Sequence, residues 1–197
     1  MLDLSNCRCI IFDLDGTILD STQVWAKVDM DFLGRRGIPV SKEYMQEIKT
    51  HTFESGSVYT KEKYNLPEST EEIMKEWYDA ACKAYTDKVV LKPYAKTFIE
   101  QMHNNGLKIV SATSSDRALF EPCLRRNGIY GFFDAFTQTN EVPRGKKFPD
   151  VYMKAAGKAG CSVNECIVFE DVLSAAQGAK SGGLMRLQLM TGRIFVG

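Results

Sequence analysis

Apolar and polar positions follow two different patterns along the chain. Residues 9–14 (CIIFDL) form an apolar run that predicts a buried strand, because it is too short for a helix. From about residue 21 to residue 87 only helical patterns occur, and Ser21, Ser41 and Ser69 stand where N-caps are expected. We expect helices from Ser21 to Leu33, from Ser41 to about Lys49, near 57–64, and after Ser69, where Glu72 completes a capping box.

After residue 88 the pattern becomes an alternation of helices and strands. Each predicted helix is followed by a glycine and then by a short apolar strand. The helices are expected at 95–105, 116–127, 151–159 and 173–180, and the strands at 107–112, 135–139, 166–170 and 185–190. Such βαβ units predict an α/β fold with a doubly wound parallel sheet covered on both faces. We assign residues 1–20 and 88–197 to this core and residues 21–87 to an inserted all-helical segment.

Composition and charge exclude several classes of partner. With 197 residues, 44% of them hydrophobic, the chain can bury an ordinary globular core. Its formal net charge of zero provides no basic field for nucleic acid or for an anionic membrane. No apolar run approaches the roughly 20 residues of a membrane span, and the N-terminus lacks a leader pattern. We therefore expect a cytoplasmic protein, monomeric or weakly homodimeric, whose partner is a small molecule.

The six cysteines form no CxxC pair, and the chain has only two histidines, His51 and His103. This usage does not favour a zinc site, and reduced thiols, mostly buried, are the simplest interpretation. Paired or redox use of Cys7 and Cys9 is the alternative.

Ligands of such sheets bind beyond the carboxyl ends of the strands, so the chemistry is expected in the loops there. The first loop carries Asp13, Asp15, Gly16 and Thr17. Residues i and i+2 of a strand share a face, so the two carboxylates can approach one pocket. They repel each other unless a cation lies between them or one keeps a proton. A solvated acidic turn would not explain the apolar strand before it.

The second and third loops are less specific when each is taken alone. Thr113, Ser114 and Ser115 could hold a phosphate through hydroxyl and backbone N–H groups, or could simply cap the next helix. Lys146 and Lys147 could be an idle surface pair.

The fourth loop brings a second acidic pair, Glu170 and Asp171, directly after a buried strand. Together, the four loops supply carboxylates, hydroxyls and a lysine, the groups that phosphoryl transfer requires around a phosphate. A divalent cation, best Mg²⁺ for oxygen ligands, would tie Asp13 to Glu170 or Asp171.

Four stretches of the chain resemble the motifs of the haloacid dehalogenase superfamily. DLDGT at 13–17 resembles the DxDG[TV] of motif I, and KIVSATSS resembles motif II, with Thr113 in the phosphate-binding position. GKKFPD resembles the motif III segment GKPxPD, with the lysine at Lys146, and IVFEDVLSAAQGAKSGGL resembles motif IV. The helical segment is similar to the C1 cap of the phosphoglycolate phosphatase and β-phosphoglucomutase group.

The resemblance implies an Mg²⁺-dependent phosphatase that works through an aspartyl phosphate. Asp13 would attack phosphorus, and Asp15 would act as acid and then base. Thr113, Ser114 and Lys146 would bind phosphate. The metal set would comprise Asp13, Glu170, Asp171 and, through its backbone carbonyl at most, Asp15. True dehalogenases lack the second aspartate, which argues against C–halogen chemistry.

Three departures from the family pattern accompany this resemblance. Lys147 stands where a proline usually follows the lysine, so the choice between Lys146 and Lys147 rests on spacing alone. The serine and glycine that often follow the motif IV acidic pair are absent. Relatives usually continue beyond the last predicted strand with another helix and strand, so we expect a bare sheet edge here.

Substrate choice is expected in the cap and its hinge. The polar break at Lys49, Thr50, His51, Thr52 and Glu54 either faces the site or merely connects two helices. The hinge would comprise Asp20 and Ser21 together with residues 87–93.

Thr17, Asp20, Thr50 and His51 are thus the candidate substrate residues. The favoured activity is hydrolysis of a small phosphorylated metabolite, such as a sugar or polyol phosphate. A phosphomutase, and a non-catalytic binding protein on the same scaffold, remain as alternatives.

Overall fold

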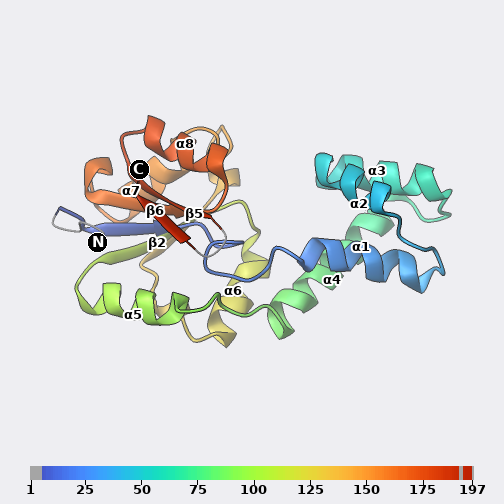
Figure 1. The fold of residues 1–197 in the computed structure, drawn as a ribbon, viewed down its shortest axis with the longest axis horizontal. Helices are drawn as coiled ribbons and strands as arrows, with labels where there is room; N and C mark the ends of the chain where they lie inside the picture. Colours follow the sequence, from blue (N-terminus) through green and yellow to red (C-terminus); the bar gives the residue numbers. More distant parts are fainter. Residues whose placement is uncertain (1–5, 191–192, 197) are drawn as a thin grey trace. The chain divides into compact units, whose positions relative to one another are not determined.

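The computed structural model describes residues 6–190 and 193–196, and their side chains as far as residue 185. The chain divides into two compact units: a sheet unit of residues 1–21 and 89–197 and a helical unit of residues 22–88. Figure 1 shows the elements of both. Within the described residues no helix is both long enough and apolar enough to cross a membrane. Residues 1–5, which belong to the stretch without a leader pattern, lie outside the described part.

The sheet unit contains a six-stranded sheet in the order β3-β2-β1-β4-β5-β6. Its strands are β1 Cys9–Phe12, β2 Lys108–Thr113, β3 Ala135–Gln138, β4 Cys166–Glu170, β5 Met185–Met190 and β6 Arg193–Val196. The first five strands run parallel, which confirms the predicted doubly wound fold. The expectation of a bare edge after β5 was wrong, because β6 pairs with β5 in antiparallel register.

The helices of the sheet unit connect its parallel strands. They are α5 Ala95–Asn104, α6 Arg117–Arg126, α7 Asp150–Lys158 and α8 Leu173–Ser181, with 3-10 turns at Tyr130–Phe132, Thr139–Glu141 and Val163–Glu165. Each of the four α-helices lies within about two residues of its predicted range. Figure 1 shows α5 on one side of the sheet and α7 and α8 on the other. This arrangement is the two-sided covering expected of βαβ units with right-handed crossovers.

Alternate residues of β1 face different helices, as the period-2 geometry of a strand requires. Cys9 and Ile11 belong to a buried cluster that includes Val151 and Ala155 of α7. Phe12 points to the other face, where its ring lies 6.2 Å from that of Phe98 in α5. The central strand is therefore buried on both sides, which explains its continuous apolar sequence.

The helical unit consists of α1 Val24–Arg35, α2 Lys42–Glu47, a 3-10 turn Ile48–Thr50, α3 Phe53–Tyr64 and α4 Thr70–Asp87. Ser41 and Ser69 cap α2 and α4 as predicted, the latter within a capping box with Glu72. Thr52 caps α3, which begins four residues before the predicted start, so Glu54 lies in a helix and not in a polar break. The prediction that Ser21 caps the first helix was wrong: the N-cap is Gln23, without a side-chain hydrogen bond.

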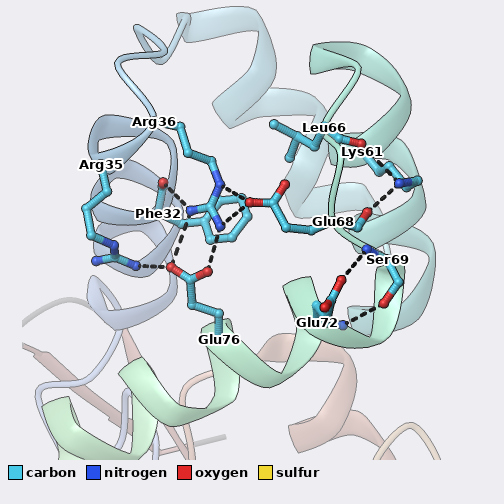
Figure 2. A network of polar contacts seen from close by, with 9 residues as sticks. All are labelled: Phe32, Arg35, Arg36, Lys61, Leu66, Glu68, Ser69, Glu72 and Glu76. Carbon is cyan, nitrogen blue, oxygen red and sulfur yellow. Dashed lines mark hydrogen bonds and ion pairs between the residues drawn. The ribbon is translucent and has the colours of Figure 1, made fainter.

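An ion-pair network joins the end of α1 to α4 and to the turn before it (Figure 2). The Arg36 guanidinium lies 3.7 Å above the Phe32 ring and donates hydrogen bonds to Glu68 at 2.9 Å and to Glu76 at 2.7 Å. Arg35 also donates to Glu76, at 2.6 Å. The hydrogen bond from Arg36 is the main reason that the pKa of Glu76 lies below its ordinary value. The planar guanidinium suits this shared role because it offers several donors in one fork.

A second polar cluster lies inside the helical unit, away from the Arg36 network. The buried Tyr44 hydroxyl lies 2.9 Å from the Thr60 hydroxyl and donates to the Asp29 carboxylate at 3.3 Å. Burial raises the pKa of Asp29 to about 6, although the hydrogen bond from Tyr44 opposes the change. The folded protein therefore holds a proton on Asp29 more tightly than the unfolded chain does.

Asp29→Asn is expected to change how stability depends on pH. Because the folded pKa is raised, the contribution of Asp29 is most favourable below the unfolded pKa of about 4 and is lost as the pH rises through 6. At pH 7 the variant should unfold at a higher urea concentration than wild type, because its free energy of unfolding should be about 3 kcal/mol larger. Its stability should also depend less on pH between pH 4 and pH 7.

Tryptophan fluorescence is a suitable measure for this test, because Trp25 and Trp77 both belong to the helical unit. Asp31→Asn is the matched control, since Asp31 lies on the same helix but is exposed and ion-paired with Lys27. Equal pH profiles for wild type and Asp29→Asn would contradict the prediction.

Candidate active site

The site is built around the loop that leaves β1. The Asp13 N–H donates to the carbonyl of Phe169 at 2.9 Å, which ties the start of the loop to the neighbouring strand β4. Gly16 has a φ of +75°, a conformation that favours glycine, and its N–H donates to Leu19 at 3.0 Å. The tight turn keeps the loop over the end of the sheet, and Asp13 is only 5% exposed.

Three carboxylates converge at this end of the sheet. Asp13, Glu170 and Asp171 each offer an oxygen, and these oxygens lie within 4.8 Å of one another. The register of the sheet explains the proximity, because Phe12 and Phe169 are partners on adjacent parallel strands and the acids follow them directly. Thr17 joins the group: its hydroxyl lies 3.2 Å from Asp13 and 3.3 Å from Asp171. The structure thus places Thr17 as a support of the acids.

Lys146 is the lysine that reaches these carboxylates. Its Nζ lies 2.5 Å from Asp13 Oδ1 and 2.8 Å from Glu170 Oε2, whereas the neighbouring Lys147 is exposed. Tyr152 of α7, fully buried, donates its hydroxyl to the same Glu170 oxygen at 2.9 Å. The other Glu170 oxygen accepts the Val172 N–H at 3.2 Å. Glu170 is therefore held from three directions.

Burial and the neighbouring charges together shift the pKa values of these groups. Burial raises the pKa of Asp13 to about 7, although the Lys146 ammonium opposes this. For Lys146 itself, burial lowers the pKa, but Asp13 and Glu170 outweigh it and hold the pKa above its ordinary value. Burial and then the Glu170 charge raise the pKa of Asp171. A buried set of acids with an excess of negative charge accounts for all three directions.

The side chain of Asp15 lies apart from the three converging acids. One of its oxygens accepts the Ser21 hydroxyl at 2.6 Å, and the other accepts the Ser115 hydroxyl. Asp15 is not among the acids whose oxygens lie within 4.8 Å of one another, although its charge helps to raise the pKa of Asp13. Ser21 does not cap α1 because that helix begins three residues later, at Val24.

The hydroxyl loop after β2 is ordered by its own contacts. The buried Thr113 hydroxyl accepts the Ser115 N–H at 3.0 Å, and Gln138 donates to the Ser115 carbonyl at 3.1 Å. The side chain of Ser114 is exposed. Asp116 caps α6 through the N–H of Ala118, so capping belongs to Asp116 and leaves the three hydroxyl residues for other roles.

The remaining predicted residues lie elsewhere. Asp20 is exposed, and its N–H donates to the carbonyl of Val90 at 2.9 Å, so the two predicted hinge segments pair with each other. In the helical unit, the Thr50 hydroxyl donates to Glu47 at 2.8 Å. His51 lies 3.2 Å from the Ser55 hydroxyl and stacks on Tyr59 with ring centroids 4.9 Å apart. These contacts occupy both residues within their own unit.

Sequence reasoning missed two residues of the site. Tyr152 lies within the predicted helix 151–159 without any motif to mark it, and its contact with Glu170 places it at the site. Lys92 lies within the predicted hinge, and its Nζ donates to the Gly16 carbonyl, in the turn after Asp13. A lysine beside a proline in a hinge carries no sequence signal for such a contact, since its partner is 76 residues away.

The converging acids fit a hard divalent cation. All the converging ligand atoms are carboxylate oxygens, the type that Mg²⁺ prefers. Three carboxylates around the Lys146 ammonium carry an excess of negative charge, which a divalent cation could compensate. Asp13, Glu170 and Asp171 are therefore the residues that could hold Mg²⁺, and Thr17 orients two of them.

Several proteins are similar to this chain in sequence. The phosphorylated carbohydrates phosphatase of Thermotoga maritima is 22% identical over 91% of this chain and 83% of that protein. Hexitol phosphatase B of Escherichia coli is 24% identical, over 87% and 78% respectively. The bifunctional riboflavin kinase/FMN phosphatase of Arabidopsis thaliana is 26% identical over 89% of this chain, which spans only 46% of that protein.

Solved structures share the fold, and a family model matches most of the chain. A candidate β-phosphoglucomutase from Thermotoga maritima superposes with a TM-score of 0.83 at 22% identity, covering 91% of this chain and 83% of the other. CbbY from Rhodobacter sphaeroides in complex with phosphate gives 0.73 at 19% identity, covering 91% and 84%. The model of haloacid dehalogenase-like hydrolases matches residues 7–183. The chain therefore belongs to the haloacid dehalogenase-like hydrolase family.

Proposed function

We propose that this hydrolase is an Mg²⁺-dependent phosphatase that forms an aspartyl phosphate, an acyl phosphate, on Asp13. The observation that carries the proposal is the buried Asp13 carboxylate, 2.5 Å from the Lys146 ammonium and beside Glu170 and Asp171. A lysine and a cation around one nucleophilic carboxylate provide the positive charge that an incoming phosphate requires. Relatives named as phosphatases of phosphorylated carbohydrates and of hexitols support this reaction class.

Two steps complete the reaction. An Asp13 oxygen attacks phosphorus, a P–O bond to the carboxylate forms, and the bond to the substrate oxygen breaks while Asp15 gives that oxygen a proton. Asp15 then takes a proton from water, the water oxygen attacks phosphorus, and inorganic phosphate leaves with Asp13 restored. The hydroxyls of Ser21 and Ser115 can donate or accept, so they can hold Asp15 in both protonation states.

Charge neutralisation divides among the other residues. Mg²⁺, held by Asp13, Glu170 and Asp171, would neutralise phosphate charge and keep Asp13 ionised. Lys146 would contact the transferring phosphoryl group, while Glu170 holds the Lys146 side chain in place. Thr113 and Ser114, with the N–H groups of their loop, would bind the phosphate oxygens.

The substrate class follows from the relatives and not from the sheet unit, which would contact only the phosphate. We propose a small sugar or polyol phosphate, in line with the names of the relatives. The helical unit would act as the cap, with Thr50 and His51 as candidate contacts for the substrate, and Asp20 would belong to its hinge. Thr17, the remaining candidate contact, donates its hydroxyl to Asp13 and Asp171 and would act mainly as a support of these acids.

Asp13→Asn should abolish phosphatase turnover, because the side-chain amide of asparagine cannot attack phosphorus to form the aspartyl phosphate. Hydrolysis of p-nitrophenyl phosphate with Mg²⁺ should fall on the order of a thousand-fold or more. Chelation of Mg²⁺ by EDTA should abolish wild-type turnover, and added Mg²⁺ should restore it. Asp79→Asn, at an exposed ion pair with Lys75, is the control and should keep full activity. Wild-type turnover no faster than that of Asp13→Asn, at any pH or metal tested, would favour the non-catalytic alternative.

Asp15→Asn should separate proton transfer from metal binding. Since the Asp15 side chain lies outside the converging acids, Mg²⁺ affinity by titration calorimetry should stay within about threefold of wild type, while turnover falls about a hundredfold or more. With a sugar phosphate as substrate, this variant should form the aspartyl phosphate on Asp13 only slowly. Loss of Mg²⁺ binding in this variant would show that the role given to Asp15 is wrong.

Rapid quench with a sugar phosphate distinguishes hydrolysis from phosphoryl transfer between sugar positions. A mutase must shield its phosphorylated aspartate from water, whereas a phosphatase releases phosphate at every turnover. We expect steady release of phosphate without any added sugar acceptor. Phosphate release that depends on an acceptor, with an isomerised sugar phosphate as product, would favour the mutase.

A further inference from the structure

The loop that carries Lys146 lies directly against helix α8, at a place without room for a side chain. A Cβ added to Gly178 would come closer than 3.0 Å to the carbonyl oxygen of Lys146. It would also lie 2.7 Å from the carbonyl carbon of Lys147 and 2.9 Å from that carbonyl oxygen. These neighbours are backbone atoms, which cannot rotate away as a side chain could. Any larger residue at position 178 must therefore displace the loop or the helix.

A second glycine lies against the same loop. A Cβ on Gly182, at the end of α8, would lie 2.5 Å from the Cβ of Pro149. Gly157 in α7 differs from both, because a Cβ there would meet nothing within 4 Å. Glycine is unfavourable inside a helix, so the helix keeps Gly178 at a position where close packing of backbone requires it.

The consequence for Lys146 follows from its contacts. Its Nζ lies 2.5 Å from Asp13 and 2.8 Å from Glu170, so the two ion pairs fix the amino group while Gly178 fixes the backbone of the same residue. To relieve the clash of a Cβ at position 178, the loop or the helix must shift by about 1 Å. A displacement of this size can reduce catalysis on the order of a hundredfold. We propose that Gly178 is a positioning residue for Lys146, with Gly182 supporting the other end of the loop.

The effect on turnover rests on the proposed function, but the effect on the surroundings of Lys146 does not. Residue-specific reductive methylation with formaldehyde and a borane therefore tests the proposal directly. A buried, protonated and ion-paired amine is a poor nucleophile, so in wild type Lys146 should react at least about tenfold more slowly than the exposed Lys147. Peptide mass spectrometry measures both rates in the same molecule.

In Gly178→Ala, methylation of Lys146 should become about fivefold faster or more, while that of Lys147 stays unchanged. Gly157→Ala, the matched control, should leave both rates as in wild type. An unchanged rate at Lys146 in folded Gly178→Ala would overturn the proposal, whether or not the protein proves to be a phosphatase. If Gly178→Ala does not fold, Gly182→Ala takes its place. A smaller rise is expected there, and the absence of any rise overturns the proposal.

Turnover supplies the second readout through a double-mutant cycle. Gly178→Ala should lower kcat for p-nitrophenyl phosphate about ten- to a hundredfold, and in a Lys146→Met background it should change kcat less than about twofold. An equal factor in both backgrounds would mean that Gly178 acts through general packing, which contradicts the proposal. Absence of turnover in wild type would refute the proposed function alone, since the methylation rates still decide the role of Gly178.

Discussion

The ion pairs of Lys146 with Asp13 and Glu170 are the interaction on which the site depends. Buried carboxylates are costly unless they are paired and hydrogen-bonded, and here three of them lie within 4.8 Å. The Lys146 ammonium partly compensates them, the Tyr152 hydroxyl donates to the same Glu170 oxygen as Lys146, and the Val172 N–H donates to the other. The negative charge that remains is of the kind that a divalent cation could compensate.

The sheet order explains how these groups meet. Strand β1 lies in the middle, so Asp13 and Glu170 leave adjacent parallel strands at the same edge, one residue beyond paired phenylalanines. The crossover between β3 and β4 brings Lys146 over that edge, and α8, which follows Asp171, supports the same loop through Gly178. The segments that precede and follow β4 in the chain thus both help to position the Lys146 amino group. The helical unit is inserted without disturbing this order, because Asp20 and Val90 pair where the chain leaves and returns.

Much of the fold and of the site could be predicted because local patterns were consistent with it. Apolar strands, glycine stops and capping boxes gave five of the strands and every long helix of the described residues to within a few positions, and β6 was missed. Asp13, Glu170 and Asp171 could be found because acids directly after buried strands have no other explanation. Ser21 was misassigned because α1 begins only at Val24, and the spacing in the sequence does not show that the Ser21 hydroxyl donates to Asp15.

The sequence by itself determined the parallel α/β fold, the inserted helices and the set of residue types at the strand ends, since these depend on periodicity and on the order of motifs. Only the tertiary structure decided that Lys146 rather than Lys147 reaches the acids, that Asp15 turns to Ser21 and Ser115, and that Tyr152 and Gly178 belong to the surroundings of the site. The physical reason is distance along the chain. Lys146 and Asp13 are 133 residues apart, and contacts of that range are set by packing, which no local pattern records.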